Sequence, residues 1–443
     1  MAKGKKKESL TPEERLQAAL VPESEQPYKV PGNWCWVYAP AVFNIEYGKG
    51  LPTKELCESG YPVFGANGQI GFYSEYMFEE EKALMSCRGA YSGTMNLSLP
   101  KSFITNNSLV IESKLADVSV KFVFYLYSAL NKASLISGSA QPQVTVQAFN
   151  NYPVPISPLP EQQRIVDRIE SLFAKLDEAR QKAQDALDSF ETRKAAILHK
   201  AFTGELTAQW RKEHGVGMES WRKTTINDIG DVKGGKRVPK GMELTCVNTG
   251  HPYLKAGNLK QGTVIASGIM YVTDEILEFI KNYTVSAGDV YITNVGACIG
   301  DCGIIPPEYE GANLTENAVK ITNLKCNNKW LSYYLSGNSV QQNIKSMIAS
   351  ATLGKLSITN IKKIELNIPT SLDEQAEIVR ILDDLLAKEQ QAKEAAEGVL
   401  EQIDLMKKAI LARAFRGELG TNDPREESAV ELLKTCYCGK LQL

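Results

Sequence analysis

Amide, hydroxyl and guanidinium side chains gather in the predicted loops of the first 150 residues. Such groups form hydrogen bonds with base edges and phosphates, and lysines add charge contacts to phosphates. The alternative for each residue is an ordinary solvated loop side chain. The candidate nucleic-acid contacts of this half are Lys49, Asn67, Gln69, Tyr73, Arg88, Tyr91, Ser92, Thr94, Asn96, Gln141 and Gln143.

The second half offers a more basic set. Six cations fall within twenty residues, at Arg222, Lys223, Lys233, Lys236, Arg237 and Lys240. From this half the candidate contacts are Lys236, Arg237, Lys255, Asn258, Lys260, Asn294, Asn313 and Lys355. We expect Arg88 to read a base and Lys236 to hold a phosphate, because arginine pairs with guanine edges and lysine acts as a point charge.

Motifs for catalysis and cofactor binding do not appear. Gly234-Gly235-Lys236 lacks the upstream glycine and the following Ser/Thr of a phosphate loop. No Asn/Asp-Pro-Pro-aromatic tetrad of an adenine methyltransferase occurs, and Glu112-Ser113-Lys114 lacks a metal-binding aspartate pattern. With three histidines and no framework of cysteine spacings, no metal site is expected. We therefore expect no bound cofactor and no catalysis by this chain alone.

An internal repeat indicates which elements position these residues. Residues 159–206 and 372–419 align without a gap and share 20 identical positions. Upstream, Trp34 matches Trp221 and Gly48-Lys49 matches Gly235-Lys236, at offsets that grow along the chain. Two copies of one unit are predicted, each with a variable globular part followed by a near-constant helical part.

The helical parts carry a heptad pattern. Apolar residues alternate by steps of four and three for over three heptads, which is typical of a coiled-coil seam. One seam position of the second copy, Glu389, is polar. The predicted seam residues are Ile165, Ile169, Leu172, Leu176, Phe190, Ile378, Leu382, Leu385, Val399 and Ile403.

The ends of these helices are marked as well. Pro160 and Glu161 suit a first helical turn, and Gly204 and Gly417 suit left-handed caps. A helix over 161–203 would be about 65 Å long. Connectivity favours antiparallel pairing of the two helices, with one globular head at each pole and a pseudo-twofold axis between them.

The globular parts are predicted to mix helices and strands. Short helices are expected at Val120–Leu130 and Lys329–Ser336. Short apolar runs bounded by Gly, Pro, Asn and Ser predict strands. These runs are Ala83–Ser86, Ser108–Ile111, Asp289–Thr293, Ala318–Ile321 and Ile364–Ile368.

Composition limits the class of protein. The chain has 443 residues, 43% of them hydrophobic, and a net charge of −2, which excludes both wholesale disorder and a histone-like binder acting through bulk positive charge. No apolar stretch approaches the ~20 residues of a membrane helix. The lysine-rich start, Met1 to Leu10, is not a secretory signal, so a cytoplasmic location with reduced cysteines is expected.

Together these patterns predict an α+β protein with two mixed α/β heads and two long antiparallel coiled-coil helices. The predicted divisions are an N-terminal extension, head 1, helix 1, a linker, head 2, helix 2 and a C-terminal tail. Their bounds are 1–26, 27–157, 158–206, 207–218, 219–370, 371–419 and 420–443.

The repeated motifs resemble those of a known family. A short motif, a heptad helix and a second short motif occur in this order, and the whole set is repeated, with substitutions, later in the chain. This pattern resembles that of the DNA specificity subunit of type I restriction-modification systems. The first copies of the two motifs are Leu159-Pro160-Glu161-Gln162-Gln163-Arg164-Ile165-Val166 and Ala201-Phe202-Thr203-Gly204-Glu205-Leu206. The resemblance extends from Pro27 to Leu419. The tail from Thr421 onward has no counterpart in the first repeat.

The resemblance implies a function for each part. Each head would be a target recognition domain for one half of a split DNA sequence, and the helices would space the heads and dock modification subunits, in two copies. Those partners would bind S-adenosylmethionine and methylate adenine, and a restriction subunit would use ATP and Mg²⁺. The rival hypothesis is a protein-binding scaffold with two adaptor heads and no DNA readout.

Overall fold

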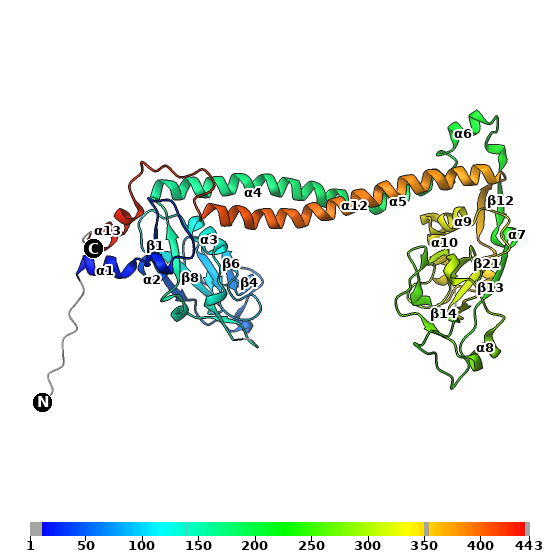
Figure 1. The fold of residues 1–443 in the computed structure, drawn as a ribbon, viewed down its shortest axis with the longest axis horizontal. Helices are drawn as coiled ribbons and strands as arrows, with labels where there is room; N and C mark the ends of the chain where they lie inside the picture. Colours follow the sequence, from blue (N-terminus) through cyan, green and yellow to red (C-terminus); the bar gives the residue numbers. More distant parts are fainter. Residues whose placement is uncertain (1–10, 139, 350–353, 439–443) are drawn as a thin grey trace. The chain divides into compact units, whose positions relative to one another are not determined.

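The computed structural model describes residues 11–138, 140–349 and 354–438, and divides into two compact units. The first contains residues up to Ala183 together with those from Gly398 onward, and the second runs from Gln184 to Glu397. Each unit therefore combines one head with part of both long helices. The secondary structure follows the predicted mixed α/β pattern (Figure 1).

The first head is built from short strands and two α-helices. A four-stranded antiparallel sheet has the order β2-β8-β5-β6, and a three-stranded sheet has the order β4-β3-β7. Two-stranded pairs are formed by β1 with β11 and by β9 with β10. The strands are β1 (Cys35–Tyr38), β2 (Phe43–Tyr47), β3 (Tyr61–Gly65), β4 (Gly68–Tyr73), β5 (Ala83–Ser86), β6 (Met95–Leu97), β7 (Phe103–Ile104), β8 (Ser108–Ser113), β9 (Ile136–Ser137), β10 (Gln143–Val144) and β11 (Pro153–Ile156).

Helices cover this head and close its core. Phe122 and Leu126 of α3 are buried in one apolar cluster with Ile165 of α4, Phe415 just after α12 and Leu433 of α13. In Figure 1, α13 lies beside α1. The helices of this unit are α1 (Pro12–Ala19), α2 (Ala39–Val42), α3 (Val120–Ala129), α13 (Ala429–Cys438), the greater part of α4 (Leu159–Asp188) and the end of α12 (Leu372–Ala414).

The second head repeats the plan with additions. Its four-stranded sheet has the order β13-β21-β18-β19 and its three-stranded sheet the order β17-β14-β20. Further pairs join β12 to β22 and β15 to β16. The strands are β12 (Trp221–Thr225), β13 (Asp231–Gly234), β14 (Pro252–Leu254), β15 (Leu259–Lys260), β16 (Thr263–Val264), β17 (Met270–Tyr271), β18 (Val290–Thr293), β19 (Cys302–Ile304), β20 (Asn313–Leu314), β21 (Ala318–Thr322) and β22 (Glu365–Pro369).

The core of the second unit joins Trp330 of α9 to Leu198 of α5 and to Ile378 and Leu382 of α12. The predicted strands and short helices of both heads are confirmed, because each falls on a strand or helix of the structure. The helices here, besides the start of α12, are α5 (Phe190–Phe202), α6 (Ala208–Glu213), α7 (Ile226–Ile229), α8 (Asp274–Ile280), α9 (Asn328–Ser336), α10 (Asn338–Ala349) and α11 (Ile358–Lys362).

The long helices pair antiparallel within each unit, as predicted. In the first unit Asp177 pairs with Lys407 and Arg180 with Asp404, so the two sequences run in opposite directions. In the second unit the polar seam residue Glu389 accepts a hydrogen bond of 2.8 Å from Arg193. This ion pair explains why a charged residue occupies the seam.

The single helix predicted over 161–203 is interrupted at Ser189, between α4 and α5. The backbone oxygen of Ala186 accepts hydrogen bonds from the side chains of Ser189 (3.1 Å) and Arg193 (3.2 Å). Side chains that insert into the backbone ladder in this way interrupt a helix. Phe190, a predicted seam residue, therefore begins α5, although it is buried as expected.

The predicted seam is right for most residues and wrong for Val399. Ile165, Ile169, Ile378, Leu382 and Ile403 are buried. Leu172, Leu176 and Leu385 are partly buried. Val399 is 42% exposed, so at this point the buried stripe of α12 is narrower than the heptad pattern predicts.

Candidate nucleic-acid interface

Four segments of the first head meet at one place, which we call the first junction: residues 48–49, 86–94, 104–107 and 141–144. The backbone nitrogen of Lys49 donates to the oxygen of Ile104 at 2.9 Å. Cys87 is bonded on both sides, because its nitrogen donates to Asn107 (2.9 Å) and its oxygen accepts from Val144 (3.0 Å). These bonds hold the loop that carries Arg88 against two other segments, and one of those two segments is bonded in turn to Lys49.

The turn between β3 and β4 adjoins the first junction. Ser108 donates its hydroxyl to the oxygen of Gly65 at 3.0 Å, and the amide of Asn96 donates to Ser86. Tyr73 lies at the other end of β4, against the ring of Phe103. It is the one candidate of the first head that does not lie on or beside the first junction. The candidates on the junction or the adjoining turn and strands are Lys49, Asn67, Gln69, Arg88, Tyr91, Ser92, Thr94, Asn96, Gln141 and Gln143.

Gly48 allows two of these segments to approach closely. A Cβ atom at this position would lie 2.4 Å from the backbone oxygens of both Ile104 and Thr105. Real Cβ atoms do not approach backbone oxygens so closely, so the junction requires glycine here.

The second head builds the same arrangement, the second junction, from residues 235–237, 294–300, 314–317 and 355–356. Lys236 donates its backbone nitrogen to Leu314 at 2.8 Å, as Lys49 does to Ile104. Asn294 donates to Asn317 and accepts from Leu356, both at 3.0 Å, as Cys87 does in the first head. A Cβ at Gly235 would lie 2.0 Å from the oxygen of Thr315.

The second junction gathers five of the eight residues predicted in this half. Lys236, Arg237, Asn294 and Lys355 belong to it, and Lys255 follows Leu254, whose oxygen accepts from Thr315 at 3.0 Å. Lys260 lies elsewhere, at the end of β15.

Asn258 and Asn313 are corrected by the structure. Both side chains are buried, and Asn313 donates its amide to the backbone oxygen of Ile280 at 2.8 Å. The amide of Asn258 donates to the oxygens of Ile265 (3.2 Å) and Ser267 (3.1 Å). These amides satisfy buried backbone groups and offer no surface to a ligand, so we withdraw them from the candidate contacts.

The cations of the junctions differ in their surroundings. Arg237 pairs with Glu316, and this hydrogen bond raises the pKa of the guanidinium. Partial burial acts to raise the pKa of Glu316, but the hydrogen bonds that the carboxylate accepts and the charge of Arg237 together outweigh burial, and the pKa is lowered. The ammonium of Lys236 lies 5.5 Å from the centre of the Tyr283 ring. Within the described ranges, the side chains of Lys49 and Arg88 are exposed and form no ion pair.

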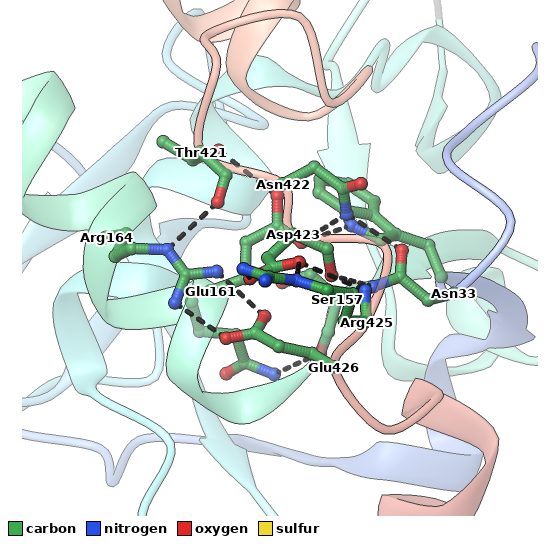
Figure 2. Close-up of polar contacts among 11 residues, drawn as sticks. Asn33, Ser157, Glu161, Arg164, Thr421, Asn422, Asp423, Arg425 and Glu426 are labelled. Carbon is green, nitrogen blue, oxygen red and sulfur yellow. Dashed lines mark hydrogen bonds and ion pairs between the residues drawn. The ribbon is translucent and has the colours of Figure 1, made fainter.

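A buried carboxylate at the start of α4 joins the first head to α4 and to the start of the C-terminal tail (Figure 2). Glu161 accepts hydrogen bonds from the indole of Trp34 (2.7 Å), the amide of Asn422 (2.8 Å) and the hydroxyl of Thr421 (3.1 Å). Arg164, one turn further on, donates to the backbone of Thr421 and to both carboxylate oxygens of Glu426. The head, α4 and the tail are thereby fixed to one another.

Glu374 at the start of α12 plays the same part in the second unit. It accepts from the indole of Trp221 (3.0 Å), the hydroxyl of Thr207 (2.9 Å) and the guanidinium of Arg211 (2.8 Å). From the sequence, Glu161 was expected only to lie in a first helical turn, and its role as an acceptor for Trp34 was not predicted. The repetition of both the tryptophan and the glutamate was the signal that could have found it.

Thr421, at the start of the tail, has a counterpart in the first repeat, which the sequence did not lead us to expect. Thr421 bonds to Glu161 as Thr207 bonds to Glu374. The first residues of the tail and of the linker therefore both donate a hydroxyl hydrogen bond to a buried glutamate, although the residues that follow differ.

No set of three or more His, Cys, Asp or Glu side chains among the described residues is arranged to hold a metal ion. Among the same residues, no helix is both long enough and apolar enough to span a bilayer.

Known proteins share this architecture. The family model described as type I restriction modification DNA specificity domain matches residues 39–186 and 218–398. The chain is 23% identical over 425 residues to the EcoBI specificity subunit of Escherichia coli, covering 87% of this chain and 86% of that subunit. It is 24% identical over 307 residues to the EcoKI specificity subunit of Escherichia coli strain K12, covering 65% of this chain and 62% of that subunit, so less than two thirds of that relative is spanned.

A solved structure is similar in fold. The HsdS subunit from Thermoanaerobacter tengcongensis superposes with a TM-score of 0.57 at 19% identity, covering 89% of this chain and 100% of that one.

The family model matches well over half of the chain, which therefore belongs to the type I restriction modification DNA specificity family. The prediction of a DNA-recognition subunit is thereby confirmed, and the comparisons do not favour the protein-binding scaffold.

Proposed function

We propose that this chain reads a two-part DNA target, with one junction contacting each half-site. The observation that carries the proposal is the duplicated junction. Each head holds equivalent backbone segments by equivalent hydrogen bonds, from Lys49 to Ile104 and from Lys236 to Leu314. Around that common frame the exposed side chains differ, so two different half-sites are expected.

The partners follow from the same proposal. The chain would act in the cytoplasm as the non-catalytic subunit of a complex with two methyltransferase subunits, and a restriction subunit would join them. S-adenosylmethionine, ATP and Mg²⁺ would be bound by those partners. The names of the relatives, which are specificity subunits of restriction enzymes, support a shared complex.

One experiment tests the function as a whole. The chain is combined with the methyltransferase subunit of a type I restriction-modification system from the same source, and methylated adenines are mapped on a random-sequence library. A split motif with a fixed gap is expected from the complex, and no methyl transfer from labelled S-adenosylmethionine is expected from the chain alone. Methylation without a motif, or transfer by the isolated chain, would contradict the proposal.

Arg88 and Lys236 should respond differently to substitution. Arg88→Ala should lose about 1–3 kcal/mol of discrimination at one base pair of the first half-site. Lys236→Ala should weaken binding to every sequence alike and lower the salt slope by about one. Titrations against single-base variants of the target, at several salt concentrations, measure both effects. A uniform loss for Arg88→Ala would rule out its role as a base reader.

An exposed apolar face on α12 suits the methyltransferase subunits. Val399 and Met406 are seven residues apart and share a helix face, and Leu405 adjoins Met406. Their side chains are 42%, 47% and 58% exposed. A long helix that exposes three large apolar side chains so close together is typical of a surface covered by a protein partner.

Removing this face should weaken the complex without unfolding the chain. The double variant Leu405→Ser/Met406→Ser should reduce methyltransferase affinity at least about tenfold, because two apolar side chains leave the interface. Lys408→Ser, a polar exposed neighbour on α12, is the matched control. Sedimentation or calorimetric titration measures the affinity, and equal affinities for the two variants would exclude this face as the docking site.

A further inference from the structure

The first junction carries a two-stranded ribbon, and no such ribbon occurs at the second junction among the residues that the structure describes. Strands β9 and β10 pair antiparallel, with Ile136 opposite Val144 and Ser137 opposite Gln143. The ribbon is tied to the Arg88 loop, because Pro142 accepts hydrogen bonds from the backbone of Gly89 (2.9 Å) and the hydroxyl of Ser92 (2.7 Å). The segment that precedes Leu356 in the second head contains helix α10 instead.

Two apolar side chains are exposed where the ribbon meets this loop. Tyr91 is 50% exposed on the loop, and Ile136 is 37% exposed on β9. A Cβ at Gly93 would lie 3.3 Å from the Cδ1 atom of Ile136, so Ile136 rests on the loop that carries Tyr91. Val144, the cross-strand partner of Ile136, is buried, which fixes the ribbon to the core.

The surroundings of these apolar side chains are polar. Arg88 on the loop and Gln143 on β10 are exposed, and they are joined by a backbone bridge. A surface that combines exposed apolar groups with hydrogen-bonding groups is complementary to a ligand that presents both kinds of group.

The major groove of DNA presents such a mixture. It is wide enough for a two-stranded ribbon, and each base edge there offers donors and acceptors. Thymine adds one apolar group, its C5-methyl, which apolar side chains contact. Arg88 and Gln143 would bond to base edges, and Ile136 and Tyr91 would cover a methyl group.

We propose that the first head reads at least one thymine of its half-site through the C5-methyl group, with Ile136 and Tyr91 as the contacting side chains. This inference rests on the proposed function. It assigns to Ile136, which is not a polar loop residue, a part in specificity.

Uracil tests the inference, because it lacks only the methyl group. The complex of the full chain with its methyltransferase is titrated with target duplexes in which single thymines of either strand are replaced by uracil. For one position in the first half-site we expect a loss of about fourfold, the effect of one buried methyl. In Ile136→Ala or Tyr91→Ala the same replacement should cost less.

Variants and duplexes outside the proposed contact serve as controls. Leu99→Ala removes an exposed apolar residue of the same head and should keep the full uracil effect. Uracil in the second half-site should act equally on wild type and Ile136→Ala. The inference is overturned if no uracil in the first half-site matters, if that half-site has no thymine on either strand, or if the loss persists in both variants. A complex with no sequence preference at all would instead overturn the proposed function.

Discussion

Gly48→Ala should abolish selective binding to the first half-site while the second half-site is still read. The new Cβ would meet two backbone oxygens at 2.4 Å, so residues 48–49 must move and the bond from Lys49 to Ile104 must break. Forcing an additional atom into a packed site typically destabilises a fold by about 1–3 kcal/mol. Here we expect the strain to be relieved by displacement of the backbone at the junction. Binding titrations with targets altered in one half-site at a time measure the loss.

The chain provides matched controls for this change. Gly50→Ala, two residues away, places its Cβ no closer than 4.0 Å to Asn106 and should leave binding unchanged. Gly235→Ala, with contacts of 2.0 and 2.3 Å, should reverse the pattern by removing the second half-site. Thermal unfolding checks that each variant is folded. Equal effects of Gly48→Ala and Gly50→Ala would refute the steric argument.

Arg211→Ala should be strongly destabilising for the second unit. Its guanidinium is buried against Glu374, and without it the carboxylate would remain buried with only Thr207 and Trp221 as donors. Breaking a buried pair from one side typically costs about 3–5 kcal/mol. The midpoint of denaturant unfolding, followed by tryptophan fluorescence, measures the change.

Arg164→Ala is the comparison, since the pair of Arg164 with Glu426 is partly exposed. Exposed pairs contribute about 0–1 kcal/mol, so a much smaller change is expected. Adding Glu374→Gln to Arg211→Ala should restore part of the loss by removing the buried charge. Similar losses for the two arginine variants would mean that burial does not set the cost.

Local patterns predicted the elements of this protein, and contacts distant in sequence decided the rest. The heptad spacing predicted the long helices, and the connectivity of the chain predicted their antiparallel pairing. Gly204 and Gly417 adopt the positive φ angles expected of helix caps. The break at Ser189 could not be foreseen, because it depends on which oxygen the side chain of Arg193 reaches.

The structure places most of the candidate contacts on or beside a junction, and their contact with DNA stays a prediction. Lys236 and Arg88 followed from residue type and position in a loop. Asn258 and Asn313 are also polar, but both are buried and donate hydrogen bonds to the backbone oxygens of Ile265 and Ile280, which a single sequence does not reveal. Tertiary contacts, and not side-chain chemistry, separate the two groups.

The contacts of Glu161 also define what can be exchanged between members of this family. A head transplanted by recombination carries Trp34 with it, whereas Glu161, Thr421 and Asn422 stay with the recipient. Any incoming head must therefore supply an indole at this position, or a buried carboxylate loses a donor. Exchange of heads between family members is thus constrained at a position remote from the DNA-reading loops. A compatible head needs this one indole, whereas the loops that determine the DNA target can vary freely.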